Sequence, residues 1–256
     1  MSLSRDRPCH YRSIVVPGAE ETFLRRCPAA GRSAGHDQDV RVGTWNLEGR
    51  WSSAHLDLLL AGLCDVWLLT EVRDDTTLPG FNSHLTTERM GRRKHWAGTF
   101  SRNPLQPLPD PHPASAAATT LGISWCSSIL PWRSCGTIPW GEGSMTQKTA
   151  RAVAQLMQSL HTGPLIWGGD WNHAMTGPEH VGSLEGRSAI KRALASPQLQ
   201  LATHDCPHRE PGLHTIDHIA IPRDAQLLDA TRVIGQRASG ERLSDHDAYI
   251  IEIALA

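Results

Sequence analysis

The sequence predicts an α/β protein, because segments with the pattern of strands alternate with segments with the pattern of helices. Residues 40–45 alternate as a strand does, and residues 65–72 form a second, mostly apolar strand. Between them, residues 51–63 carry apolar side chains at helical spacing, and Ser52 or Ser53 can cap the helix. This order of strand, helix and strand is the main reason for expecting an α/β fold.

The rest of the chain continues the same pattern. A helix is expected over residues 144–161 and a shorter one over residues 187–196. On the longer helix we place Ala150, Val153, Ala154, Met157 and Leu160 on the apolar face, and Lys148 and Arg151 away from it. Further strands are expected at residues 81–88, 95–102, 121–130, 165–167 and 215–221 and at the C-terminus, whereas the proline-rich residues 103–114 form an irregular connection.

Composition indicates a soluble globular protein. The 256 residues are 39% hydrophobic and 20% charged, with a net charge of −1. Because there is no overall positive field, any grip on a polyanion has to be local. No apolar run approaches the roughly 18 residues that a membrane span needs, and the first twenty residues lack the apolar core of a signal peptide. We therefore expect a cytoplasmic protein that is a monomer.

The first 39 residues differ in character from the remainder. They mix Arg, Pro, Gly, Ser and His without a sustained period, which predicts a loosely ordered extension before one domain over residues 40–256. The six cysteines are far apart and form no C-x-x-C pair, so we expect most of them to be reduced and inert.

Polar groups follow several of the predicted strands. Asp170 and Asn172 leave the strand at residues 165–167 two positions apart, so both side chains can reach one reacting group. A carboxylate that aligns water or a metal, beside an amide that holds an oxygen, suits a phosphate. Asn46 and Glu48 repeat this spacing after the first strand, and Glu71 ends the second.

A second acidic group has an expected histidine partner. Asp217 shares one strand face with Ile219 and Ile221, so its carboxylate is buried and needs a partner. His246 precedes the last strand and is the expected partner, because a carboxylate fixes the tautomer of a histidine and raises its basicity. His218 points away from Asp217 and is expected to be structural.

A basic turn and the tryptophans are the candidates for substrate binding. Residues 89–94 are the densest positive segment of the chain, and Arg92, Arg93 and Lys94 could meet a polyanion, although a solvated loop is the commoner role of such a turn. Trp171 lies between Asp170 and Asn172 and could stack on a base, although packing is the commoner use of tryptophan.

The ordered series of short motifs resembles that of the endonuclease/exonuclease/phosphatase superfamily, which has the deoxyribonuclease I-like fold. These motifs are Thr44-Trp45-Asn46, Thr70-Glu71, Gly169-Asp170-Trp171-Asn172, Ile216-Asp217-His218-Ile219 and Ser244-Asp245-His246. The resemblance runs from Val40 to the C-terminus. It implies a four-layered α/β sandwich, in which two packed mixed β-sheets are flanked by helices.

The resemblance also implies a catalytic role for each motif. Glu71 would be the principal ligand of a catalytic Mg²⁺, for which Mn²⁺ could substitute, helped by Asn46, Glu48 and Asp245. Asp170 and Asn172 would position the attacking water and the phosphate. His246, oriented by Asp217, would act as a base or as a cationic clamp on the transition state. The resemblance does not assign a leaving-group acid; besides metal-bound water, His112 and Arg133 are the options.

Several functions remain open at this point. The first is a Mg²⁺-dependent phosphoesterase that acts on DNA or RNA, and the second is a small-molecule or lipid-headgroup phosphatase of the same fold, which the neutral charge balance favours. A binding module without activity is the third. A zinc site built from His204, Cys206, His208 and His214 is a separate alternative, although these residues lack a standard zinc-binding frame.

Overall fold

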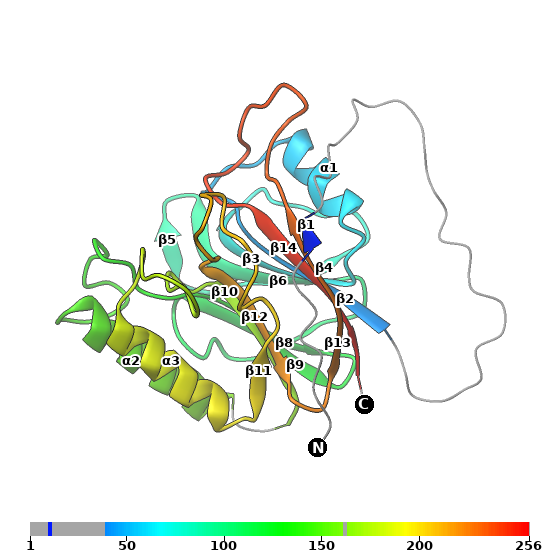
Figure 1. The fold of residues 1–256 in the computed structure, drawn as a ribbon. Coiled ribbons are helices and arrows are strands. Elements are labelled where there is room, and N and C mark those ends of the chain that lie inside the picture. The colour runs from blue at the N-terminus through cyan, green and yellow to red at the C-terminus, as the bar shows by residue number, and fades with distance from the viewer. Residues whose placement is uncertain (1–9, 12–38, 161–162, 256) are drawn as a thin grey trace, which may run out of the picture.

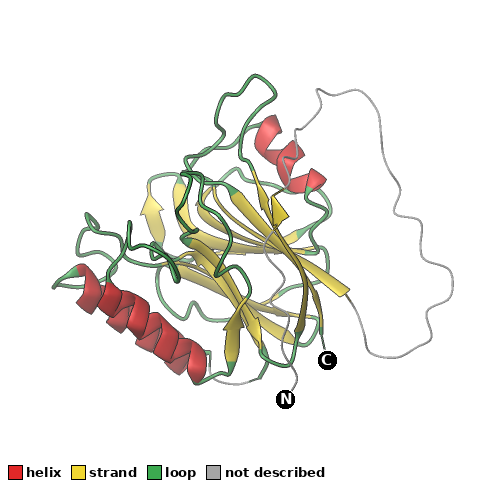
Figure 2. Cartoon of the chain, in the orientation of Figure 1, coloured by secondary structure: helices red, strands yellow, loops and turns green. Residues whose placement is uncertain are grey.

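Two mixed β-sheets and three helices make up the part of the chain that the computed structural model describes, namely residues 10–11, 39–160 and 163–255. The first sheet has the strand order β1-β13-β14-β2-β3-β6-β4, with β5 paired to β6, and the second has the order β11-β12-β10-β9-β8-β7. In Figure 1 the helix α1 lies beside the first sheet, whereas α2 and α3 lie together on the far side of the second. Figure 2 shows the same helix–sheet–sheet–helix layering, as the family resemblance implies.

The strands have the following bounds. Those of the first sheet are β1 His10–Tyr11, β2 Asp39–Asn46, β3 Val66–Arg73, β4 Asn82–Leu85, β5 Arg89–Gly91, β6 Lys94–Ser101, β13 Gln226–Val233 and β14 Ala248–Ala254. Those of the second are β7 Gln106–Pro107, β8 Ser115–Thr120, β9 Ile123–Ile129, β10 Leu165–Asp170, β11 Leu199–Leu201 and β12 Asp217–Pro222.

Three apolar layers hold the sandwich together. Val42, Leu68, Ile166 and Ile219 belong to the layer between the two sheets, where a face of each sheet is buried. A second layer joins the first sheet to α1 (Ser53–Ala61), and a third joins the second sheet to α2 (Met145–Ser159) and α3 (Leu184–Ala195). Each sheet is therefore covered on both faces, which explains why its central strands are almost entirely apolar.

The long helix α2 begins where the sequence predicts, but its buried face is rotated from the predicted one. Ser144 forms a capping box with Gln147, which fixes the helix start. The buried residues are Lys148, Thr149, Ala152, Val153 and Leu156, whereas Ala150 and Ala154 are exposed. Val153 and Leu160 are buried and Met157 packs against the core, as predicted. The prediction was wrong for Ala150, Ala154 and Lys148: the ammonium group of Lys148 lies inward and donates to the carbonyls of Cys135 and Gly136, at 3.1 and 2.8 Å.

Several strands were not predicted, and β7 lies within residues 103–114, which were expected to be irregular. The strand β8 is rich in Ala, Ser and Thr and lacks the branched residues typical of strands, and β11 has only three residues. The strand β13 alternates poorly because it pairs through a bulge between Leu227 and Asp229. Their neighbours in the sheets, rather than their own composition, hold these segments extended.

Residues 10–11 form β1, which pairs in parallel with β13 at the edge of the first sheet. The expectation of a loosely ordered extension did not include this strand. The other residues before Asp39 lie outside the described residues, and the division of the chain at residue 39 stays a prediction. The free cysteines Cys64, Cys126 and Cys135 are buried, in line with the expected inert role.

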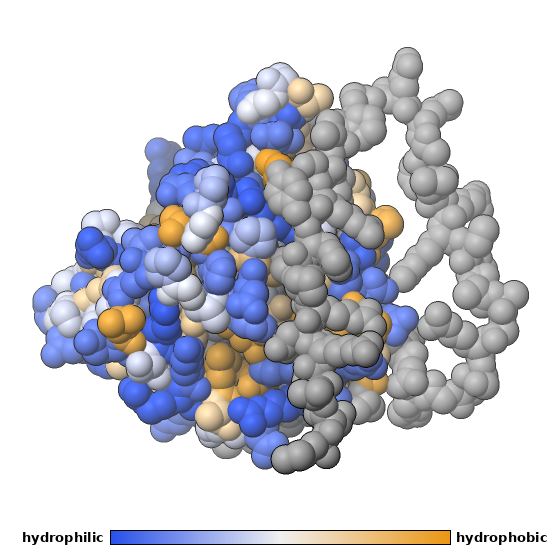
Figure 3. All heavy atoms as spheres, in the orientation of Figure 1, coloured by the Kyte–Doolittle hydropathy of each residue, from blue (hydrophilic) through white to orange (hydrophobic). Residues whose placement is uncertain are grey.

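The visible surface is mainly hydrophilic. On the face drawn in Figure 3, hydrophobic residues form small separate groups among polar ones. Among the described residues, none of the helices has both the length and the apolar character required to cross a bilayer.

Candidate functional site

The ends of strands from both sheets meet at one edge of the sandwich. Asn46 ends β2 and lies next to β3, which carries Glu71, because these strands are parallel neighbours. In the other sheet, β10 and β12 place Asp170 directly opposite Asp217. His246 enters from the loop before β14. The antiparallel and parallel registers therefore bring distant parts of the sequence to one place.

One unbroken series of contacts links these side chains. The Asn46 amide group donates to Glu71 Oε1 at 3.3 Å and to Asp170 Oδ2 at 3.0 Å. His246 Nε2 lies 3.8 Å from that same Asp170 oxygen, and His246 Nδ1 donates to Asp217 Oδ2 at 2.7 Å. Glu71 and His246 thus belong to one site rather than to opposite sides of the molecule.

The members that lie deepest, Asp170, Asp217 and His246, form what we call the buried end. Burial raises the pKa of Asp170 to about 7 against the opposing effect of His246, and burial likewise raises the pKa of Asp217. For His246, burial alone would lower the pKa, but the carboxylates of Asp217 and Asp170 outweigh it and raise the pKa to about 10. At neutral pH the histidine is therefore cationic, and it neutralises part of the carboxylate charge.

Asn172 stabilises the buried end through the main chain. Its backbone N–H donates to Asp170 Oδ1 at 3.0 Å, and its side-chain amide donates to the carbonyl of Leu130 at 2.9 Å. Leu130 in turn donates its own N–H to the carbonyl of Asp170. The carboxylate of Asp170 is thus fixed on one oxygen and presents the other to Asn46 and His246.

Glu48, Glu71, Lys94 and Asp245 form what we call the open end of the site, because their side chains are 20–56% exposed. Lys94 Nζ lies 2.5 Å from Glu71 Oε2. Glu48 accepts from Arg50 at 3.0 Å and from the backbone N–H of Asp245, also at 3.0 Å. Carboxylates therefore gather here together with the cations that balance them.

Backbone conformation sets three site residues apart. Glu48, Glu71 and Asn172 have φ values of 54°, 52° and 51°, the left-handed region that non-glycine residues seldom adopt. At Glu71 the pairing of β3 with β6 passes from Thr70 to Val72, so Glu71 itself leaves the regular ladder. This backbone conformation turns the side chains out of the sheet and toward the site. It could not be predicted from the sequence.

Two uncharged residues, Ser244 and Trp45, help to hold the loop before β14. Ser244 Oγ donates to the carbonyl of Asn46 at 2.7 Å and accepts the backbone N–H of His246 at 3.1 Å. Trp45 Nε1 donates to the carbonyl of His246 at 3.1 Å, and its ring stacks on His55. Both residues lie inside the motifs quoted above, but their supporting role is visible only in the structure.

The donor set at the open end is chemically suited to a divalent cation. Glu48, Glu71 and Asp245 offer hard carboxylate oxygens, and Glu71 already has an ammonium group beside it, which indicates a position that attracts positive charge. Asn46 was expected to help bind the metal. Instead, its Oδ1 accepts from the backbone N–H of Glu48 at 2.8 Å, and its amide N–H groups face the carboxylates. The only group of three His, Cys, Asp or Glu ligands that converges within 4.8 Å in the described part of the chain is Asp170, Asp217 and His246.

Trp171 is not available to a substrate, so the prediction that it binds one was wrong. Its side chain is 0% exposed and its ring stacks on Trp167, with 4.1 Å between the centroids. Because side chains alternate along an extended backbone, the residue between Asp170 and Asn172 points into the core beneath them.

The basic turn is largely neutralised by neighbouring acids. Arg93 pairs with Asp75 at 3.4 Å, and Lys94 pairs with Glu71. Arg92 is exposed and forms no ion pair with any residue that the structure describes. The turn lies beside the open end, because β6 begins at Lys94 next to β3, but its free positive charge is smaller than the sequence indicates.

Two other proposed roles do not agree with the structure. The zinc alternative is wrong, since Cys206 is disulfide-bonded and has no free thiolate to offer. His112 is 4% exposed, stacks on Trp140, and has its pKa lowered to about 4 by burial, so it cannot serve as a leaving-group acid. His218 is buried between Thr203 and the carbonyl of His173, as expected for a structural residue.

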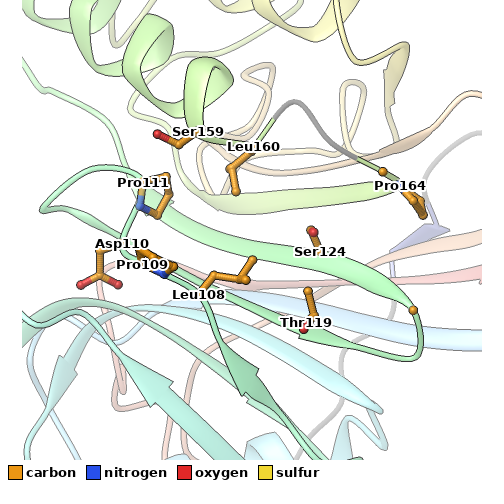
Figure 4. A pocket seen from close by; sticks show the side chains of 11 residues that line it. Leu108, Pro109, Asp110, Pro111, Thr119, Ser124, Ser159, Leu160 and Pro164 are labelled. Carbon is orange, nitrogen blue, oxygen red and sulfur yellow. The ribbon is translucent and has the colours of Figure 1, made fainter.

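A cavity of about 440 Å³ lies at the other end of the second sheet. Figure 4 shows Leu108, Asp110, Ser124 and Pro164 around it. Ser124 is near the start of β9 and Pro164 precedes β10, whereas Asp170 is the last residue of β10. At about 3.3 Å per residue the cavity is roughly 20 Å from Asp170, too far to hold a reacting group of the site.

Fold and site together define an α/β sandwich with an acid–histidine cluster at one edge. The model of the Endonuclease/Exonuclease/phosphatase family matches residues 43–246. The chain therefore belongs to this family, whose members are hydrolases acting on phosphoester bonds. A search of curated proteins found no match to the sequence.

Solved structures with the same fold are distant in sequence. An AP endonuclease from Archaeoglobus fulgidus is 15% identical with a TM-score of 0.63, over 83% of this chain and 98% of that one. A 3'-5' exonuclease from Neisseria meningitidis is 17% identical with a TM-score of 0.60, over 84% of this chain and 100% of that one. A 3' phosphatase from Neisseria, solved with a product DNA hairpin, is 18% identical with a TM-score of 0.61, over 83% and 98%. These similarities confirm the predicted fold.

Proposed function

We propose that the protein is a divalent-metal-dependent phosphoesterase that hydrolyses phosphodiester bonds in DNA or RNA. The observation that supports this most directly is the series of contacts from Glu71 through Asn46 and Asp170 to His246 and Asp217. It joins a carboxylate suited to a metal, a buried acid and a cationic histidine, which are the groups that phosphoryl transfer needs.

The buried end would carry the proton and charge chemistry. Burial raises the pKa of Asp170 into the neutral range, so this carboxylate is poised to accept a proton from an attacking water. His246 is held by Asp217 and is cationic, so its Nε2 can donate to a phosphoryl oxygen as negative charge develops there. Asn172 keeps Asp170 in place through its backbone N–H.

The open end would hold the metal. Glu71 would be its principal ligand, with Glu48 and Asp245 on the same side, and Mg²⁺ or Mn²⁺ suits their oxygens. A bound ion would supply positive charge against the phosphate and its leaving group. Arg92 would add a contact to the phosphate backbone at the rim.

Nucleic acid is the favoured substrate because the relatives with solved structures include enzymes named for endonuclease and exonuclease activity. One observation favours a smaller phosphoester instead. The acids Asp75 and Glu71 already engage Arg93 and Lys94, which leaves little free positive charge for a long polyanion. A small-molecule or lipid-headgroup phosphatase is therefore the second candidate.

Purified protein incubated with Mg²⁺ against plasmid, single-stranded DNA, RNA and a panel of phosphomonoesters tests the proposal. We expect metal-dependent cleavage of a nucleic acid that is lost in Glu71→Ala and His246→Ala. Release of phosphate from monoesters alone would identify the second candidate. Absence of product from every substrate, by protein that circular dichroism shows to be folded, would favour a binding module and overturn the proposal.

A further inference from the structure

Lys94 places its ammonium group against the carboxylate of Glu71, the proposed principal ligand of the metal. Its Nζ is 2.5 Å from Glu71 Oε2, and the two side chains are 29% and 20% exposed. The other carboxylate oxygen of Glu71 accepts from Asn46 at 3.3 Å. Both oxygens of this carboxylate are therefore occupied by donors from the protein itself.

The position of Lys94 is fixed by more than this ion pair. Lys94 begins β6 and pairs with Arg73 at the end of β3, two residues beyond Glu71. Its aliphatic stem passes over Gly49, where an added Cβ would lie only 2.6 Å from Lys94 Cδ. Gly49 also donates its N–H to the carbonyl of Glu71 at 3.0 Å. The glycine thus leaves room for the lysine and ties the same loop to Glu71.

On this basis we infer that Lys94 is a positioning residue that holds the Glu71 carboxylate and competes with the divalent ion for it. A metal that binds Glu71 has to displace the ammonium group from Oε2, so part of its binding free energy is used to break the ion pair. The inference rests on the proposed function, because it assigns the metal to Glu71. It differs from the expectation for Lys94, which was contact with substrate.

Direct binding of Mn²⁺ to the full chain, followed by electron paramagnetic resonance without substrate, tests the inference. Removing the charge in Lys94→Met should tighten Mn²⁺ binding about fivefold, the size expected for a partly exposed ion pair. Lys94→Arg retains the charge and should bind Mn²⁺ as the unaltered protein does. Lys191→Met removes an exposed lysine on α3 and should leave binding unchanged.

The outcomes separate the inference from the proposed function. Equal or weaker Mn²⁺ binding by Lys94→Met would overturn the competition, while tight binding that is lost in Glu71→Gln would still support the metal site. No Mn²⁺ binding by any variant would overturn both. If Lys94→Met fails to fold, as judged by circular dichroism, Lys94→Gln takes its place in the same measurement.

Discussion

The two ends of the site differ in how firmly the surrounding protein holds them. At the buried end, the side chains of Asp170, Asp217 and His246 are 5%, 3% and 15% exposed. Burial raises the pKa of both carboxyl groups, and the carboxylates raise that of His246. At the open end, exposure reaches 33% for Glu48 and 56% for Asp245. The fold itself prepares the first set of groups, whereas the second set is left accessible for a ligand to organise.

The largest expected effect is on kcat/KM, which we compare for one acid from each end of the site. Asp170→Asn removes the proposed proton acceptor and should lower kcat/KM about 10³-fold. Glu48 accepts hydrogen bonds from Arg50 and Asp245, and glutamine has nearly the same shape. Glu48→Gln should therefore lower kcat/KM no more than about tenfold. Steady-state kinetics on the best substrate measures both. Equal losses would contradict the division between a buried and an open end.

The next largest effect is on the free energy of unfolding and concerns Gly169, which precedes Asp170 in β10. Gly169 has φ 128°, and an added Cβ would lie 2.1 Å from the carbonyl oxygen of Ser128 on β9. Gly169→Ala should therefore lower the free energy of unfolding by about 4 kcal/mol, from strain and overpacking together. Urea denaturation measures it.

Gly240 provides the matched control for that substitution. It also has a positive φ, 85°, but an added Cβ would meet nothing within 4 Å. Gly240→Ala should cost only the conformational part, about 1 to 2 kcal/mol. Similar losses at the two glycines would mean that close packing under Asp170 is not the cause.

Low pH should destabilise the protein through His218, which follows Asp217 in β12 and whose ring packs against Trp171. Burial lowers the pKa of His218 to about 3, so the folded protein keeps this ring neutral. Below pH 6.5 the unfolded chain binds the proton more readily, so stability falls as the pH falls, by about 3 kcal/mol at pH 4. Urea denaturation at several pH values should give a smaller slope for His218→Gln. An unchanged slope would exclude His218 as a source.

The smallest effect is expected at the basic turn beside the open end. Arg92→Gln should raise the KM for a nucleic acid by about threefold at low salt, because it removes a free surface charge. Arg93→Gln should change KM less, because Asp75 already pairs with Arg93. Kinetics at two salt concentrations separates these results. A larger effect at Arg93 would show that its ion pair opens when substrate binds.

Sequence alone could predict which residues meet, but not how each is held. Asp217 and His246 could be paired because a buried acid needs a partner, and their hydrogen bond of 2.7 Å confirms it. The contacts of Lys94 and Lys148 could not be predicted, since their partners, a carboxylate and two carbonyls, are brought next to them only by the tertiary structure. Trp171 was misassigned because a motif gives the neighbours of a residue along the chain, whereas burial depends on the strand face.

The same limit applies to the fold. Strong apolar runs such as β3 and β10 could be found, because their own composition favours a buried strand. The strand β8 could not, because its small residues are held extended by β9 rather than by their own preference. The positive φ values of Glu48, Glu71 and Asn172 likewise arise from tertiary structure.

The pairing of β10 with β12 constrains how the gene can change. Asp170 faces Asp217 in an antiparallel register, and the next residue on β12 is the inward-packed His218. One codon inserted ahead of the strand, in the exposed turn at residues 209–212, leaves this alignment intact. One codon inserted within β12 would exchange the sides of every following residue and carry Ile219 and Ile221 out of the layer between the sheets. Length variation in related genes should therefore accumulate in that turn and avoid the strand.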